Sequence, residues 1–230
     1  MTHHPSPTRD RALEAARRLA GQVAGAMQAD LSLRLWDGSV VGRGDPARGG
    51  MAMDVYQRRQ DQFARAEKQA LLDTSYFIDR AEDLYGYPHF VCDTGGSICE
   101  WVDPEDPADP ILTELARRCL LVWIEGSEAH TEELIRRFDR APKPMAYQPQ
   151  FLARVWAEYL ETHDLTEEAV DPDAFIRWTY AQALAHRQPR YEAMARHWGV
   201  TVPAAEMAAV RSPADFDTVI GTALERRAAS

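Results

Sequence analysis

One stretch decides the fold class that the sequence predicts: Tyr85-Gly86-Tyr87-Pro88-His89-Phe90-Val91-Cys92-Asp93-Thr94-Gly95-Gly96-Ser97-Ile98-Cys99-Glu100. Gly86 is a helix stop, and the apolar run 87–92 that follows it predicts a short strand. This strand ends on Asp93, which leads into a Thr-Gly-Gly-Ser loop. Because α/β proteins place ligands where parallel strands end, the acid and its glycine loop form the first candidate site.

A second apolar run repeats this design further along the chain. Residues 119–124 are apolar, and Glu125-Gly126-Ser127 follows them. Strands separated by helices favour a parallel sheet with crossover helices, so we expect a helix-rich α/β fold with a small parallel sheet flanked by helices. Two central strands are few for a complete domain. A protein partner or a missing segment is therefore expected to complete the sheet.

The composition is that of a globular protein, with 45% hydrophobic and 27% charged residues. A net charge of −10 argues against a nucleic-acid partner, which would require a basic face. No run approaches the roughly eighteen apolar residues of a membrane helix, and the N-terminus lacks the apolar region of a secretion signal. We therefore expect no membrane partner and a cytoplasmic location. The three cysteines (Cys92, Cys99 and Cys119) predict reduced thiols rather than a disulfide framework.

The chain divides into two parts at a glycine-rich linker. Residues 1–42 predict an N-terminal helix followed by a β-hairpin, in which 31–36 alternates apolar and polar residues and Asp37-Gly38 forms the turn. The string 31–39 is similar to the segment that precedes the catalytic domain in cyclopropane-fatty-acid-synthase-like methyltransferases. This resemblance implies a methyltransferase-associated protein as one alternative. Residues 43–230 form the second part.

Start and stop signals predict the helices of the second part. Residues 51–72 form a charged helix, and Gly86 stops the next one. Further helices begin after Ser127, at Asp171-Pro172 and at Ser212-Pro213, where a capping side chain precedes the first turn.

Four interpretations compete for the stretch from Asp93 to Ser97. It has the shape of an aspartic-protease half-site, but such enzymes are β-rich and need a second copy. It also resembles the phosphate hairpin of sugar-kinase and actin-like ATPases, a fold that requires far more chain. Asp93 could hold Mg²⁺ through water at the carboxyl end of a strand, or it could cap the glycine turn through the backbone. The residues alone leave these last two evenly balanced.

Two further groups of side chains each allow two interpretations. The basic residues that follow the second strand either close over nucleotide phosphates or form a solvated helix end; they are Arg136, Arg137, Arg140 and Lys143. His89 and two cysteines suggest a metal, but the separation of Cys92 and Cys99 is not a zinc spacing.

From residue 44 to residue 227 the chain resembles the C-terminal part of a poorly characterised group of bacterial P-loop ATPases. The matching strings are 44–50, 85–97, 123–127, 136–144 and 185–191. This resemblance implies a kinase-like nucleotide domain that binds ATP and Mg²⁺, with Asp93 as the catalytic and metal-binding carboxylate. It also implies that the nucleotide contacts come from Thr94, Gly95, Gly96, Ser97, Arg136, Arg137, Arg140 and Lys143.

The chain departs from that family at one decisive point. P-loop ATPases hold phosphates on a G-x-x-x-x-G-K-[ST] loop, and the sequence contains no such string; its lysines are Lys68 and Lys143. We therefore expect an incomplete P-loop NTPase-like core, in a truncated or degenerate nucleotide-binding protein that is weakly active or inactive. The alternative from another class is a noncatalytic interaction domain whose sheet a partner completes.

Overall fold

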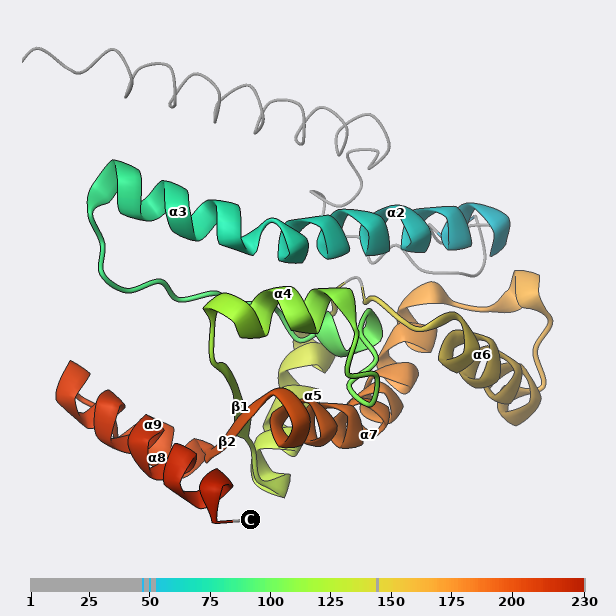
Figure 1. Cartoon of the computed structure of the whole chain (residues 1–230). Helices are drawn as coiled ribbons and strands as arrows, with labels where there is room; N and C mark the ends of the chain where they lie inside the picture. The colour runs from blue at the N-terminus through green and yellow to red at the C-terminus, as the bar shows by residue number, and fades with distance from the viewer. Residues whose placement is uncertain (1–46, 48–49, 51–52, 144, 230) are drawn as a thin grey trace, which may run out of the picture.

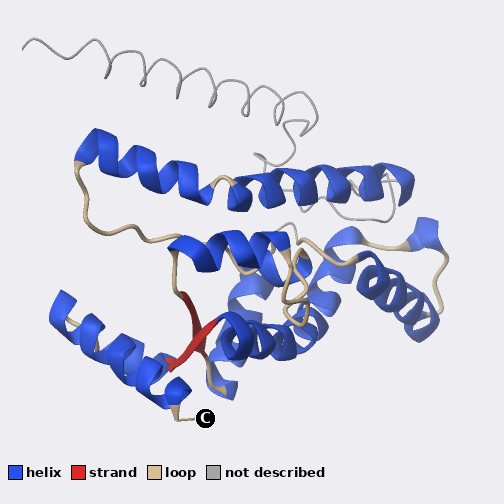
Figure 2. Ribbon diagram, in the orientation of Figure 1, coloured by secondary structure: helices blue, strands red, loops and turns tan. Residues whose placement is uncertain are grey.

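The computed structural model describes residues 47, 50, 53–143 and 145–229. Helices dominate this part of the chain, and two short strands lie among them (Figure 2). The helix and hairpin expected within residues 1–42 lie outside the described residues. The helix-rich class with a small parallel sheet flanked by helices is confirmed.

Ten longer elements follow one another along the described chain (Figure 1). They are α2 (Met53–Leu72), α3 (Thr74–Tyr85), α4 (Pro110–Arg118), β1 (Leu121–Glu125), α5 (Glu128–Arg140), α6 (Pro149–His163), α7 (Pro172–Trp198), β2 (Gly199–Pro203), α8 (Ala204–Ala209) and α9 (Pro213–Ala228). Two 3₁₀ turns, η3 (Ile98–Glu100) and η4 (Glu167–Ala169), complete the set.

Local signals begin and end the helices as the sequence predicts. Gly86 ends α3 in the left-handed conformation, with φ of 64°, and its N–H donates to the carbonyl of Glu82. The carboxylate of Asp171 accepts from two N–H groups in the first turn of α7, and the hydroxyl of Ser212 accepts from the N–H of Asp215 in the first turn of α9. These caps satisfy helix-end donors that would otherwise lack partners.

The sheet consists of β1 and β2, which pair in parallel from Leu121 opposite Gly199 to Glu125 opposite Pro203. Helices α5, α6 and α7 form the connection between the two strands. The predicted strand at 119–124 is therefore correct with slightly shifted bounds. The sequence interpretation did not identify β2, a Gly-Val-Thr-Val-Pro run that follows α7 directly.

The strand predicted at 87–92 is wrong. Residues 87–92 belong to no strand, although they are extended chain between α3 and the glycine loop. Their side chains are largely in solvent, and that of Val91 is 91% exposed. An apolar run becomes a strand only when a neighbouring edge accepts its backbone hydrogen bonds, and no strand among the described residues pairs with this segment.

Three apolar clusters hold the helices and the sheet together. The first joins α6 to the N-terminal half of α7, with Trp156 and Phe175 edge to face. The second joins α4, η3 and the C-terminal half of α7 around Leu112 and Met194. The third lies between the sheet and α9. Helix α7 contributes to the first two clusters and contacts both strands, so it is the central support of the fold.

Candidate functional site

Asp93 caps the glycine turn. One of its carboxylate oxygens, Oδ1, accepts a hydrogen bond from the N–H of Gly95 at 2.9 Å. Gly95 has φ of 69°, a left-handed conformation that glycine adopts without strain. Of the two interpretations left balanced by the sequence, this geometry matches the turn cap. Asp93 lies in solvent, and it does not follow a strand of the sheet.

The glycine loop after Asp93 is anchored to two helices. The hydroxyl of Tyr191 on α7 donates to the carbonyl of Gly96, and a Cβ added to Gly96 would lie 3.3 Å from that hydroxyl. The hydroxyl of Ser97 donates to the carboxylate of Glu67 on α2 at 2.7 Å. Thr94 donates only within its own turn, to the carbonyl of Gly95 at 3.4 Å. Gly96 and Ser97 therefore fix the loop in place.

A buried ion pair secures the next turn. Nε of Arg187 donates to Oε1 of Glu100 at 2.6 Å, and these side chains are 7% and 0% exposed. Arg187 also donates to the carbonyl of Ala146 at 2.6 Å, and the N–H of Gln148 donates to the other oxygen of Glu100 at 3.0 Å. Arg190 donates to two further carbonyls, at 2.6 and 2.7 Å. Helix α7 thus connects η3 to the segment that enters α6.

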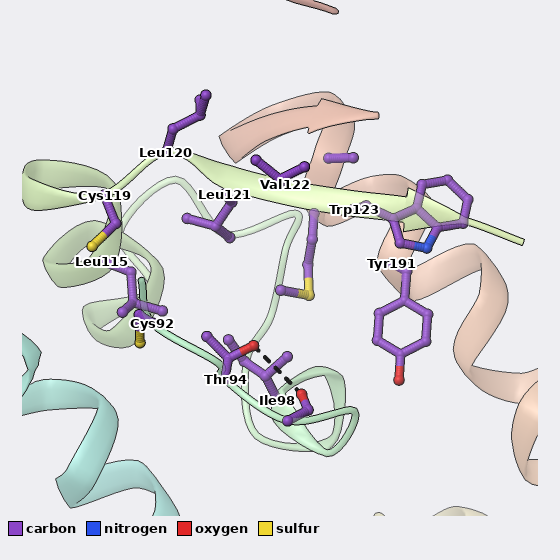
Figure 3. A pocket seen from close by; sticks show the side chains of 13 residues that line it. Cys92, Thr94, Ile98, Leu115, Cys119, Leu120, Leu121, Val122, Trp123 and Tyr191 are labelled. Atoms are coloured by element: carbon purple, nitrogen blue, oxygen red, sulfur yellow. Dashed lines mark hydrogen bonds between the residues drawn. The ribbon is translucent and has the colours of Figure 1, made fainter. Parts of the chain in front are cut away.

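A cavity of about 180 Å³ lies between the loop and β1 (Figure 3). Its walls come from the loop and the segment before it (Cys92, Thr94, Gly95), from the end of α4 through the first residues of β1 (Cys119, Leu120, Leu121, Val122, Trp123) and from neighbouring elements (Ile98, Leu115, Tyr191, Met194, Ala195). None of these thirteen side chains carries a charge. Three successive strand residues line it, from Leu121 to Trp123. Because strand side chains alternate between the two faces of a sheet, a cavity that touches all three lies at the edge of β1.

The edge of β1 that borders the cavity is the edge that has no partner strand among the described residues. Within the described part of the chain β1 pairs only with β2, and no residue of β2 lines the cavity. Figure 3 shows the extended backbone from Cys92 to Thr94 across the cavity from the segment Leu120 to Trp123, before the chain turns into η3 at Ile98. We call the space between these two extended segments the slot.

The cysteines near the slot differ in accessibility. Cys99 is fully buried, and burial raises the pKa of its thiol to about 11, so it is a poor nucleophile at neutral pH. Cys92 and Cys119 are free, partly exposed thiols that both line the slot. Burial, and then the proximity of Cys92, raise the pKa of Cys119. Cys119 is therefore expected to be a thiol rather than a thiolate near neutral pH.

The basic residues proposed to contact phosphates lie on or just after α5, and none of them lines the slot. Arg136 and Arg140 form surface ion pairs with Glu133, at 3.1 and 3.5 Å. Arg137 and Lys143 are also exposed. Of the residues assigned to nucleotide binding, the structure therefore brings only Thr94 and Gly95 to the slot. No group of three metal-binding side chains occurs among the residues that the structure describes.

The sequence interpretation missed the side chains that hold the loop. Arg187, Arg190 and Tyr191 lie within one of the strings that carry the family resemblance, but the resemblance implies no role for them. Their spacing of i, i+3 and i+4 places them on one face of α7. That spacing was a readable signal, although it does not identify the carbonyls and the carboxylate that the side chains contact.

No protein-family model matches the chain, and comparisons with curated proteins and with solved structures likewise give no match. None of the described helices is long and apolar enough to span a bilayer.

Proposed function

We propose that this chain is a noncatalytic interaction protein whose sheet is completed by a β-strand of a partner polypeptide. The observation that carries the proposal is the slot: the unpaired edge of β1 and the extended segment ending at Thr94 border one uncharged cavity. An unpaired strand edge presents a row of N–H and C=O groups that an added strand can use. Such an added strand would pair with β1.

Exposed apolar side chains at the border of the slot support this proposal. Leu120, just before β1, and Ile124, within it, are 40% and 51% exposed, and Val91, which precedes the lining residue Cys92, is 91% exposed. Covering such side chains is favourable, at about 25 cal/mol per Å² of apolar surface removed from water. A strand seated in the slot would shield both borders at once.

The chemistry of the loop supports a noncatalytic role. Phosphoryl transfer depends on positioning the phosphates and neutralising their charge. The slot offers no charged side chain, Asp93 bonds to its own turn, and two of the arginines are paired with Glu133. A partner strand requires none of these charges, because its main contacts are backbone hydrogen bonds.

Selection of peptides tests the proposal. From a phage-displayed library of random dodecapeptides, the protein should enrich sequences in which apolar and polar residues alternate. Changing Ile124→Lys at the edge of β1 should weaken their binding about tenfold or more, because a charge then lies beside the entering strand.

Leu134→Lys is the matched control for this experiment. Leu134 is 42% exposed, a fraction similar to that of Ile124, but it belongs to α5 rather than to β1. Peptides that bind both variants as tightly as the unchanged protein would contradict the proposed site, as would a library that yields no alternating sequences.

Nucleotide binding without hydrolysis is the second candidate function. Two aromatic rings, those of Trp123 and Tyr191, line the slot together with the backbone of Gly95 (Figure 3). The cavity has room for about one ring-sized group, so a nucleobase could enter it. The resemblance to P-loop ATPases, in which Asp93 would hold Mg²⁺, belongs to this candidate.

Replacing Asp93 by asparagine separates a turn cap from a metal ligand. Because asparagine caps a turn nearly as well as aspartate, we expect a loss of about 1 kcal/mol or less in the free energy of unfolding. For a turn cap, binding of Mg²⁺·ATP measured by calorimetry should be the same in both proteins. Weaker Mg²⁺-dependent ATP binding in Asp93→Asn, with unchanged melting, would instead favour the nucleotide site.

A further inference from the structure

Helix α3 is bonded to α4 through polar side chains. The hydroxyl of Ser75 donates to the carboxylate of Glu114 on α4, and Asp79, one turn further along α3, accepts from Arg118 at 2.7 Å. Thr74 is the only residue of α3 that is buried. Figure 1 shows α4 along one side of α3, which follows directly after α2. The contacts that fix α3 in place therefore make little use of its apolar residues.

The apolar residues of α3 lie on another side of the helix and are exposed. Phe77, Ala81, Leu84 and Tyr85 follow one another at i, i+4, i+7 and i+8, the spacing of one helix face. Phe77, Leu84 and Tyr85 are 42%, 37% and 60% exposed, and the adjoining Tyr76 is 58% exposed. A helix of a globular protein normally turns such a face toward the core. We call these five residues the α3 surface; no other described residue buries it.

The α3 surface and its surroundings are large enough for a stable interface. Eight of the thirteen large apolar side chains that are exposed in the described chain lie between Leu72 and Val91. A large side chain that is half exposed presents about 100 Å². Together these eight present about 800 Å², which is about what each partner contributes to a protein–protein interface of standard size.

The chemistry of this region fits a protein rather than a lipid surface. Residues 84–92 contain no Asp, Glu, Lys or Arg, whereas Glu82, Asp83 and Asp93 flank them. Anionic lipid headgroups would repel these flanking carboxylates. Aromatic side chains with few charges among them are typical of the centre of a protein–protein interface.

The order of residues in α3 makes the surface complementary to itself. The pairs Tyr76-Phe77 and Leu84-Tyr85 lie at equal distances from the peptide bond between Arg80 and Ala81. When two α3 helices run antiparallel about a two-fold axis at that point, the first pair of each helix meets the second pair of the other. Two-fold symmetric dimers are also the commonest oligomers of soluble proteins.

The centre of this arrangement has room for a close approach and carries a compensated charge. Ala81 has the smallest side chain of the α3 surface, so it lets the two helix backbones come near each other. Arg80 already forms an ion pair with Asp83 of the same helix, at 3.4 Å. Its charge therefore does not have to find a partner in the second copy.

We propose that two copies of this chain form a dimer through the α3 surface, with their α3 helices antiparallel around a two-fold axis near Arg80 and Ala81. In this dimer Tyr76 of each copy packs on Tyr85 of the other, and Phe77 packs on Leu84. The inference goes beyond the proposed function, because no residue of the α3 surface lines the slot. The dimer carries two slots, one in each copy.

Light scattering coupled to size-exclusion chromatography tests the dimer in the full chain. The unchanged protein should elute with twice the chain mass of 25.9 kDa. Phe77→Asp should raise the dissociation constant of the dimer about a hundredfold or more, because symmetry places two unpaired carboxylates in one apolar contact. Phe216→Asp on α9 is the matched control, since Phe216 is 43% exposed, and it should leave the mass unchanged.

A monomeric mass for the unchanged protein at every protein concentration would overturn the proposal. A dimer that Phe77→Asp does not weaken, or that Phe216→Asp weakens equally, would place the contact on another surface and would overturn it as well. Circular dichroism of both variants should match that of the unchanged protein, because both side chains lie at the surface.

A pair of charged variants tests the antiparallel arrangement. Tyr76→Lys and Tyr85→Glu should each be monomeric alone, because each opposes a new charge to a tyrosine ring. Mixed in equal amounts, the two variants should recover the dimeric mass, since the introduced lysine of one chain then lies beside the introduced glutamate of the other. A mixture that stays monomeric would contradict the antiparallel arrangement.

Failure of this inference is distinguishable from failure of the proposed function. Ile124→Lys at the edge of β1 should weaken peptide binding and leave the dimeric mass unchanged, whereas Phe77→Asp should do the reverse. The loss of both properties in either variant would show that the two surfaces are not independent, and would overturn the assignment of the dimer to α3 alone.

Discussion

Replacing Arg187 by methionine is expected to lower the free energy of unfolding by about 3–5 kcal/mol. The guanidinium is the charged partner of Glu100, whose side chain is fully buried, and it also satisfies the carbonyl of Ala146. Methionine fills much of the same volume but leaves the carboxylate without a countercharge in a region of low dielectric. A buried charge that has lost its partner costs far more than a surface pair gains.

Urea unfolding followed by circular dichroism measures this loss, and Arg154→Met supplies the control. Arg154 pairs with Glu158 at the surface, where the two side chains are 57% and 48% exposed. Its replacement should cost about 1 kcal/mol or less. Adding Glu100→Gln to Arg187→Met should recover part of the stability, because glutamine is neutral and still accepts from the N–H of Gln148. Equal losses for Arg187→Met and Arg154→Met would show that the buried pair contributes no more than a surface pair.

The features that the sequence predicted well are those determined by neighbouring residues. Gly86 ends a helix because the following backbone needs a left-handed residue, and Asp171 with Pro172 begins one because cap and first turn are adjacent in sequence. The apolar run after α4 became β1 for a similar reason, since its pattern is compact and bounded by a glycine.

The errors concern long-range partners. Residues 87–92 have the composition of a strand, but composition does not show whether a neighbouring edge is available, and none pairs with them in the described chain. The strand β2 was missed because it follows α7 without a loop and has only five residues, from Gly199 to Pro203.

The same limit explains the outcome at the candidate site. The sequence left Asp93 between a metal ligand and a turn cap, because both use the same carboxylate in the same short string. The contacts that hold the loop and the turn after it come from residues 30 to 95 positions away: Ser97 with Glu67, Glu100 with Arg187, and Gly96 with Tyr191. Periodicity places such side chains on a helix face, but only the tertiary fold identifies what they contact.

The pairing of the two strands depends on the absence of a side chain at Gly199. A Cβ built on Gly199 would lie 2.3 Å from the carbonyl oxygen of Leu121, directly opposite in the register, and 2.7 Å from the Cβ of Leu121. The backbone at Gly199 has a negative φ of −155°, so it lies outside the left-handed region that favours glycine. The requirement for glycine therefore comes from the close approach of β1.

Gly199→Ala is accordingly expected to reduce the free energy of unfolding by about 1–3 kcal/mol, the usual cost of forcing an extra methyl group into a packed site. Gly221→Ala is the matched control. Gly221 lies within α9 with nothing within 4 Å of its added Cβ, so alanine there should stabilise the helix by about 0.5–1 kcal/mol.

Urea unfolding measures both changes in stability. Changes of opposite sign would support close contact with β1, rather than backbone freedom, as the reason for the glycine at position 199. A loss of stability in both variants, or in neither, would contradict it. Because β2 holds one edge of β1, Gly199→Ala should also weaken any peptide that binds the other edge.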